Sequence, residues 1–213
     1  MNRQAAEDQD EDLGAREKIL REATHLFAEA GFEGTSLREI AEAVGVQKGS
    51  LVYHFESKEK IREAVLESLI ARWNTILPQI ILKASTGENR FERTISECTR
   101  FFREDPNRAR FLLRECLDHP DELQARVARE LAPWLGMLAE RIRQGQKEGI
   151  IHAEADPLVY VWGVVLLIIS TMAVIGMSAA VIGPKKVQER IETELIRMAR
   201  TSLFFEPSKG RKA

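Results

Sequence analysis

A short run of polar side chains between Val46 and Phe55 is the part of the sequence best suited to chemistry. It offers an amide, an ammonium, a hydroxyl, a phenol and an imidazole, on Gln47, Lys48, Ser50, Tyr53 and His54. Amides and hydroxyls can read base edges, whereas ammonium groups and other polar side chains hold phosphates and sugars. We interpret this run as a surface for double-stranded DNA.

Two short helices joined by a tight turn must position these side chains. Ser36 and Glu39 form a capping box that begins the first helix, because the hydroxyl and the carboxylate satisfy opposite unpaired amides. Ala41 lets the helices approach, Gly45 accepts positive φ at the turn, and Leu51 anchors the second helix in the core. This spacing predicts a helix-turn-helix, whose usual ligand is the DNA major groove.

Longer helices are expected on both sides of this unit. An amphipathic helix runs from Ala15 to a glycine at Gly31, and another opens at Ser57 and continues through Ile76. The first supports the helix-turn-helix, and the second couples it to the rest of the chain.

Three runs in this region resemble the DNA-binding domain of TetR-family transcriptional regulators. They are Gly31 to Ser36, Ile40 to Val46 and Lys48 to Lys58, and they carry glycine and aromatic residues at fixed spacing. The resemblance implies phosphate and base contacts from Thr35, Lys48, Gly49, Tyr53, His54 and Lys58. Val52 departs from the family pattern, since many members carry a tyrosine there.

With the contacts expected from side-chain chemistry, the predicted DNA-binding set is Thr35, Ser36, Gln47, Lys48, Gly49, Ser50, Tyr53, His54 and Lys58. Simpler interpretations remain open for some members. Lys48 and Lys58 are also compatible with solvated surface lysines, and His54 with a packed, hydrogen-bonded histidine. Gln47 and Ser50 are the best candidates for base edges.

The overall charge of the chain gives no sign of nucleic-acid binding, because basic residues are not in excess. The chain has 31 basic and 33 acidic residues, and acidic side chains slightly outnumber basic ones between residues 15 and 67. We therefore expect salt-sensitive, sequence-selective binding by a dimer instead of purely electrostatic binding. Two cysteines set no disulfide framework and suit a reducing cytosol, so the expected location is cytoplasmic.

The predicted fold is all-α, with an N-terminal three-helix helix-turn-helix domain followed by a helical ligand-binding and dimerisation domain. Helix starts are expected at Asp105-Pro106, Asp118 to Asp121 and Asp156-Pro157. Pro133 either kinks a helix or separates two. The predicted divisions are a disordered acidic segment at 1–14, the DNA-binding domain at 15–60, the effector-binding and dimerisation domain at 61–205 and a flexible tail at 206–213.

The apolar segment from Leu158 to Gly183 has two interpretations. It carries no charged side chain and exceeds the roughly 20 residues that span a bilayer. However, basic residues near the C-terminus and the N-terminal helix-turn-helix both favour the cytoplasmic side, which a single span does not allow. We expect no membrane contact and interpret the segment as a buried helix that, with the last helix (about Lys185 to Phe204), forms a homodimer interface.

The middle helices are expected to enclose a small-molecule effector. The proposed contacts are Phe101, Phe111, Arg114, Trp134, Met137 and Trp162. Ordinary core packing explains the same residues, and the effector stays unidentified.

Enzymatic and metal chemistry find little support. Cys116 and His119 have the spacing of half a zinc site without a second pair, and no phosphate-binding loop or nucleophile motif is present. The sequence predicts no enzyme, no metal and no cofactor. It favours a ligand-responsive, dimeric regulator, a repressor released from its operator by a small molecule. The alternative is a helical small-molecule-binding or membrane-associated protein whose helix-turn-helix serves only packing.

Overall fold

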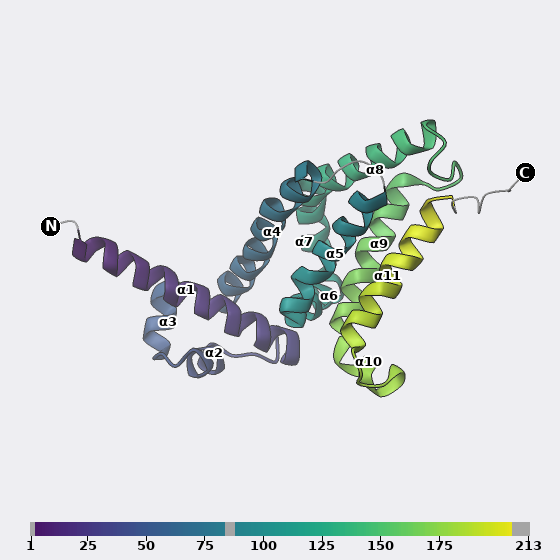
Figure 1. The fold of residues 1–213 in the computed structure, drawn as a ribbon. Helices are drawn as coiled ribbons and strands as arrows, with labels where there is room; N and C mark the ends of the chain where they lie inside the picture. Colours follow the sequence, from purple (N-terminus) through teal and green to yellow (C-terminus); the bar gives the residue numbers. More distant parts are fainter. Residues whose placement is uncertain (1–2, 84–87, 206–213) are drawn as a thin grey trace, which may run out of the picture.

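The chain folds into an N-terminal bundle (α1–α3) and a larger bundle of helices connected to it by α4 (Figure 1). The structure, a computed structural model, describes residues 3–83 and 88–205. Within these residues the first elements are α1 (Arg3–Ala30), α2 (Leu37–Val44), α3 (Lys48–His54), α4 (Lys58–Lys83), α5 (Glu88–Glu104) and α6 (Pro106–Asp118). The remaining elements are α7 (Pro120–Arg126), a π-helical turn at Val127–Leu131, α8 (Ala132–Lys147), α9 (Pro157–Ala173), α10 (Ile175–Ile182) and α11 (Val187–Leu203).

The described residues are helical and contain no strands, as predicted. Aspartates cap two of the expected helix starts: Asp105 accepts from the amide of Asn107 at 3.1 Å, and Asp156 accepts from that of Leu158 at 3.0 Å. A proline follows each cap at the first helical position, where no amide proton is needed. Before Pro133 the backbone stays helical through the π-helical turn, whose Val127 carbonyl accepts from the Ala132 amide, and α8 begins at Ala132 directly after it.

One helix boundary differs from the sequence-based expectation. The backbone of α1 is helical from Arg3, before the expected start at Ala15. No proline interrupts this part of the chain, and Gly14 alone does not end the helix, because one glycine costs only about 1 kcal/mol. The expected tail at 206–213 lies outside the described residues.

The apolar run predicted as one helix is two helices. α9 ends at Ala173 and meets α10 at an angle of 76°. The Ala173 carbonyl accepts a hydrogen bond from Nε of Arg110 at 2.8 Å, so a side chain takes the acceptor that the next helical turn would use. No single helix among the described residues has the length and apolar character of a membrane span, and only this bent pair meets those criteria together.

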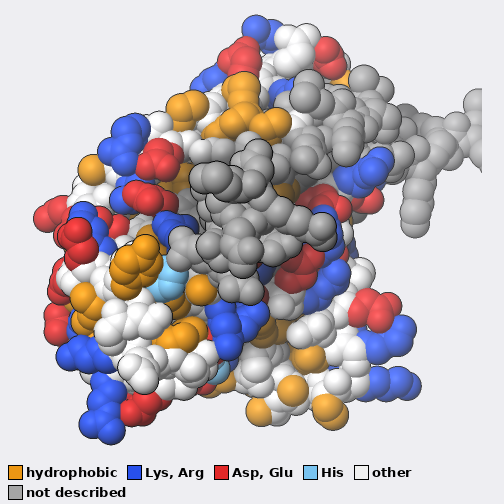
Figure 2. Space-filling model, turned by 90° about the vertical axis from the view of Figure 1, so that its left-hand side faces the viewer, with side chains coloured by type: hydrophobic (Ala, Val, Ile, Leu, Met, Phe, Trp, Pro, Cys, Tyr) orange, Lys and Arg blue, Asp and Glu red, His pale blue; other side chains and the backbone are white. Residues whose placement is uncertain are grey.

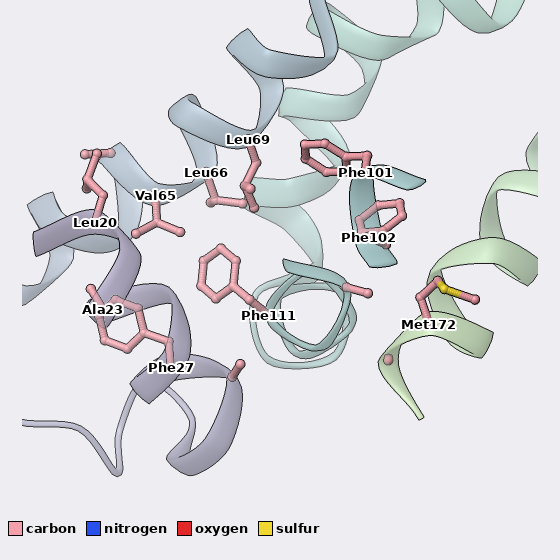
Figure 3. Packing of buried hydrophobic residues seen from close by; sticks show 14 of the residues in the cluster. Leu20, Ala23, Phe27, Val65, Leu66, Leu69, Phe101, Phe102, Phe111 and Met172 are labelled. Atoms are coloured by element: carbon pink, nitrogen blue, oxygen red, sulfur yellow. The ribbon is translucent and has the colours of Figure 1, made fainter. Parts of the chain in front are cut away.

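One continuous core joins the N-terminal bundle to the larger one. Phe27 of α1, Val65 and Leu66 of α4 and Phe111 of α6 are all buried. Figure 3 shows Phe111 reaching from α6 into the space between α1 and α4, and its ring stacks on Phe27 with centroids 6.1 Å apart. The N-terminal bundle is therefore packed against the larger bundle as well as covalently linked to it.

Candidate nucleic-acid interface and internal cavity

Local contacts fix the geometry of the α2–α3 pair. The predicted capping box is present: the Glu39 amide donates to Oγ of Ser36 at 3.2 Å, and the Ser36 amide donates to Oε2 of Glu39 at 2.7 Å. After α2, Gly45 adopts a left-handed conformation with φ of 80°, where a β-carbon would be strained. Leu51 and Phe55 are buried on the inner side of α3. The pair is thus a helix-turn-helix held by its own residues.

The outer face of α3 presents the polar side chains to solvent. Gln47, Lys48, Gly49 and Ser50 are exposed, and Tyr53 is 84% exposed. The rings of Tyr53 and His54 meet edge to face with centroids 5.5 Å apart. An exposed tyrosine of this kind contributes nothing to the core and offers a ring and a hydroxyl to a ligand. The face can therefore supply both hydrogen bonds and an aromatic surface.

Three members of the predicted DNA-binding set support the fold. Thr35 is buried, and its hydroxyl donates to the Gly31 carbonyl at 2.8 Å. Ser36 caps α2, as described above. Nζ of Lys58 donates to the Phe32 carbonyl at 2.8 Å and lies 4.2 Å from the centre of the Phe32 ring. An ammonium group has three protons, so Lys58 keeps donors for a phosphate, whereas the Thr35 hydroxyl proton is already used.

Acidic and basic side chains alternate around this end of the molecule. Figure 2 views the molecule from the side at which α1 begins, and its blue and red side chains are interspersed. Arg38 pairs with Glu42 on α2 at 2.7 Å, and Lys60 pairs with Glu63 on α4 at 2.8 Å. These pairs reduce the local positive field, which agrees with the near-neutral charge of residues 15–67.

A buried ion pair lies where α4 meets α6. Nη1 of Arg62 donates to Oε2 of Glu115 at 2.9 Å, both side chains are almost inaccessible, and Nη2 also donates to the exposed Glu122. Among the described residues, Nε of Arg62 has no hydrogen-bond partner. Burial raises the pKa of the Glu115 carboxyl, although the Arg62 guanidinium acts in the opposite direction. No local sequence pattern predicts this pair, because its members are 53 residues apart in the chain.

The ring of Phe32 connects this ion pair to the loop before α2. The Arg62 guanidinium lies 5.4 Å from its centre, and the His119 ring meets it edge-on at 5.7 Å. Cations favour the face of an aromatic ring. The loop that leads into the helix-turn-helix is therefore held by residues of α4 and by the residue that follows α6.

Three arginines of α6 bind the C-terminal turns of three other helices. Arg108 donates to the Phe101 carbonyl of α5 at 2.8 Å, and Arg110 donates to the Ala173 carbonyl of α9, as noted above. Arg114 donates to the Ala28 and Glu29 carbonyls of α1, each at 3.0 Å. Carbonyls in the last turn of a helix lack intrahelical partners and favour cations. α6 thus ties α1 of the N-terminal bundle to α5 and α9.

A cavity of about 390 Å³ lies in the larger bundle, among α5, α8, α9, the loop after α8 and the end of α11. Its wall is mainly apolar and includes Ile95, Leu138, Ile142, Val161, Val164 and Ile168. The backbone of Ile151 forms an isolated bridge with that of Phe204 beside it. Among the described residues no group of three or more His, Cys, Asp or Glu side chains is arranged to hold a metal ion.

None of the six residues expected to contact an effector lines this cavity. Phe101 and Phe111 are core residues, Arg114 binds the end of α1, and the Trp134 indole donates to Oδ1 of Asn74 at 2.8 Å. Met137 is 43% exposed and Trp162 is 39% exposed. The expectation was based on aromatic and polar residues, whereas the wall consists mostly of branched aliphatic residues. Nothing in the sequence separates such residues from ordinary core.

Comparison with known proteins relates this geometry to a family. Residues 19–65 match the family model described as bacterial regulatory proteins, tetR family. The biofilm operon icaADBC HTH-type negative transcriptional regulator IcaR of Staphylococcus aureus (strain Newman) is 40% identical over 62 residues, 29% of this chain and 33% of that protein. The HTH-type transcriptional repressor KstR2 of Rhodococcus jostii (strain RHA1) is 40% identical over 65 residues, 30% of this chain and 32% of that protein. The matches span about a third of these relatives.

The likeness of the whole chain is one of fold. The ketosteroid transcriptional regulator KstR2 of Mycobacterium tuberculosis superposes with a TM-score of 0.70 over 90% of this chain and 95% of that chain, at 19% identity. The larger bundle therefore has the architecture of such regulators, while sequence similarity to the curated relatives is concentrated around the helix-turn-helix.

Proposed function

Because this chain belongs to the tetR family of bacterial regulatory proteins through residues 19–65, we propose that it is a ligand-responsive transcriptional repressor. In this proposal, α3 enters the major groove of an operator and a small molecule in the larger bundle releases the protein. The observation that carries the proposal is the α2–α3 pair, a family-matched helix-turn-helix with a buried inner side and an exposed polar face.

The exposed face of α3 supplies the reading groups in this proposal. Gln47 and Ser50 face base edges, while Lys48 and Tyr53 contact the sugar-phosphate backbone. His54 and Gly49 lie on the same short helix as Lys48 and Tyr53, and they approach the DNA sugar-phosphate backbone next to those two contacts. Thr35 and Ser36 act through the geometry of the turn, and Lys58 keeps protons for a phosphate while it holds Phe32.

A second copy of the chain covers the outer faces of α9 and α11 in this proposal. Val159 is 67% exposed, Leu166 is 40% exposed, and Trp162 lies between them on the same face of α9. Met198 of α11 is also 45% exposed. Exposed apolar patches of this kind mark association surfaces, and two helices from each subunit form a four-helix interface. A two-fold dimer presents two α3 helices to two half-sites.

In this proposal, helix α6 transmits a change at the cavity to the N-terminal bundle. α9 forms part of the cavity wall, and its C-terminus is bound by Arg110 of α6. Arg114, also on α6, binds the end of α1. A ligand that favours a different position of α9 therefore also favours a different position of the N-terminal bundle. The two α3 helices of the dimer then no longer match the half-site spacing.

Selection from a random DNA pool, followed by fluorescence anisotropy, tests this function. We expect one palindromic sequence to be enriched and bound by the dimer, with affinity that falls as salt rises. The double variant Lys48→Ala with Tyr53→Ala should lose selective binding while keeping its helical content. Met177→Ala, at a residue that is 69% exposed on α10, is the matched control and should bind normally. Failure to enrich any sequence at low salt would refute the proposal and favour a helix-turn-helix that serves only packing.

A further inference from the structure

The internal cavity carries an inference about the chemistry of its occupant. We propose that it takes an uncharged, largely hydrocarbon small molecule, held mainly by burial of apolar surface. The regulatory meaning of this ligand rests on the proposed function, but its binding does not require DNA.

The depth of the cavity offers contact with hydrocarbon on several sides. Ile95 comes from α5, Ile142 from α8, and Val164 and Ile168 from α9, while Leu203 closes the side formed by the end of α11. Leu203 is fully buried and Ile168 is almost so. Removal of apolar ligand surface from water is favourable in proportion to the area buried. A volume of about 390 Å³ is near the lower end of ligand-binding pockets, so the occupant is small.

Two ionisable residues within the apolar part of the wall are both held neutral. The apolar surroundings raise the pKa of the Cys98 thiol to about 12, and burial raises the pKa of Tyr160 to about 12. The Tyr160 hydroxyl proton is also used, because it donates to the Ala199 carbonyl at 2.5 Å. These two groups supply no charge to a ligand ion, and an unpaired buried ion is costly.

The charges near the cavity lie at its exposed rim and are of opposite sign. Arg141 and Glu148 are solvent-exposed residues at the α8 edge of the cavity. Between them, the amide of Gln144 donates to Oε1 of Glu148 at 2.7 Å. Because these two side chains carry opposite charges, the rim adds no net charge that would favour one sign of ligand. The wall and the rim therefore agree on a neutral occupant.

Gly145 and Ile151 close the cavity beside this rim. A β-carbon at Gly145 would lie 2.6 Å from Cδ1 of Ile151, so only glycine lets the loop residue pack so closely. Nε2 of Gln146 holds the loop by donating to the His152 carbonyl at 2.9 Å and to the Ala155 carbonyl at 2.8 Å. Close packing of Ile151 on Gly145 and the hydrogen bonds of Gln146 therefore hold this side of the cavity wall in place.

Three probes with the same chain and different head groups test the proposal: 1-octanol, octanoate and octyltrimethylammonium. Each is titrated into the full-length, DNA-free protein at pH 8 by isothermal titration calorimetry. We expect one saturable octanol site per chain. Both ions should bind at least about tenfold more weakly, which corresponds to about 1.4 kcal/mol, because each carries a charge that the wall does not pair.

Two matched substitutions place the site. Val164→Phe adds a ring at the cavity wall and should weaken octanol binding about tenfold by filling the space. Val181→Phe makes the same change at a residue that is 84% exposed on α10 and should leave octanol binding unchanged. Circular dichroism confirms that each variant is folded, and the wild-type comparison of the three probes needs no variant.

Several outcomes would overturn the inference. Octanoate or octyltrimethylammonium binding as tightly as octanol would show that the site accepts an ion. Absence of saturable octanol binding by the folded wild type, or unchanged octanol binding by Val164→Phe, would show that the cavity is not the site. If the wild type bound octanol at one saturable site but selected no operator sequence, the proposed function alone would be refuted. The failure of the proposed function and the failure of this inference are therefore distinguishable.

Discussion

The face of α3 is held in place by residues a few positions apart, whereas the cavity is enclosed by side chains from α5, α8, α9 and the end of α11. Ser36 bonds Glu39, Thr35 bonds Gly31, and Gly45 makes the turn. The cavity wall has no comparable local set, since Ile95 and Val164 meet there only after the larger bundle has packed. A recognition surface can thus reside in one short motif, while a binding volume depends on the packing of distant helices.

The two regions also use polar groups in opposite ways. The N-terminal bundle exposes amide, ammonium and phenol groups to solvent on α3, whereas the cavity wall keeps Cys98 and Tyr160 neutral and its charges at the rim. Between the regions lie Arg62, Glu115 and the arginines of α6, which are paired with carboxylates or helix ends. Polar contacts between distant parts of the chain therefore connect the N-terminal bundle to the helices around the cavity.

Removing Glu115 should break this connection with the largest effect. Glu115→Ala leaves the Arg62 guanidinium buried without its closest carboxylate, and removal of one partner of a buried ion pair costs about 3–5 kcal/mol. Urea unfolding followed by circular dichroism measures the loss of free energy of unfolding. Glu122→Ala removes the exposed carboxylate of the same arginine and should cost only about 0–1 kcal/mol. Equal losses for the two variants would show that burial of Glu115 does not govern the pair.

A pair of leucines tests whether the two regions differ in packing. Leu51 of α3 and Leu203 of α11 are both fully buried, but only Leu203 lines the cavity. Leu51→Ala should lower the free energy of unfolding by about 2–5 kcal/mol. Leu203→Ala should cost about as much, because its side chain is as fully buried as that of Leu51 although it lies beside the cavity. Chemical denaturation compares them, and a much smaller loss at Leu203 would show that its side chain is loosely packed against the cavity.

The same contrast explains what the sequence could predict. The capping box, the glycine turn, the buried Leu51 and the helix starts at prolines are local patterns, and the structure confirms them. The all-α architecture follows from the same helical periodicity. These features depend on neighbouring residues, so a pattern of a few positions is enough to specify them.

Features that depend on distant residues were not predictable. The break between α9 and α10 occurs where Arg110 binds the Ala173 carbonyl, a contact between residues of different helices. The cavity lies among aliphatic residues that have no distinguishing composition. The aromatic Trp162, which the sequence favours as an effector contact, lies on the outer face of α9. Long-range packing decides both outcomes.

Weakening the arginine contact to α1 should have an intermediate effect. Arg114→Gln removes a charged donor from the Ala28 and Glu29 carbonyls, and hydrogen bonds that involve a charged group contribute about 1.5–3 kcal/mol. Thermal and urea unfolding measure the change. Arg143→Gln alters an exposed arginine that pairs with Glu140 on α8 and should change stability by about 0–1 kcal/mol. If both variants lost the same small amount, α6 would not hold the N-terminal bundle through Arg114.

The smallest predicted effect separates support from recognition within the predicted DNA-binding set. Ser36→Ala removes the cap of α2 and should lower the free energy of unfolding by about 1 kcal/mol. Ser50→Ala changes an exposed hydroxyl on α3 and should leave stability within about 0.5 kcal/mol, while weakening binding to the selected operator. Unfolding curves and anisotropy titrations on both variants, at a temperature where each is fully folded, give the two quantities.

The comparison depends on which quantity each serine changes. If Ser36→Ala weakens operator binding as strongly as Ser50→Ala without a loss of stability, then Ser36 contacts DNA directly and its cap is secondary. If stability alone changes, the hydroxyl of Ser36 serves the turn, where its oxygen accepts from the Glu39 amide. The cap bond uses a lone pair of the Ser36 oxygen and not its proton, so the binding titration, and not the cap geometry, decides whether Ser36 also contacts a phosphate.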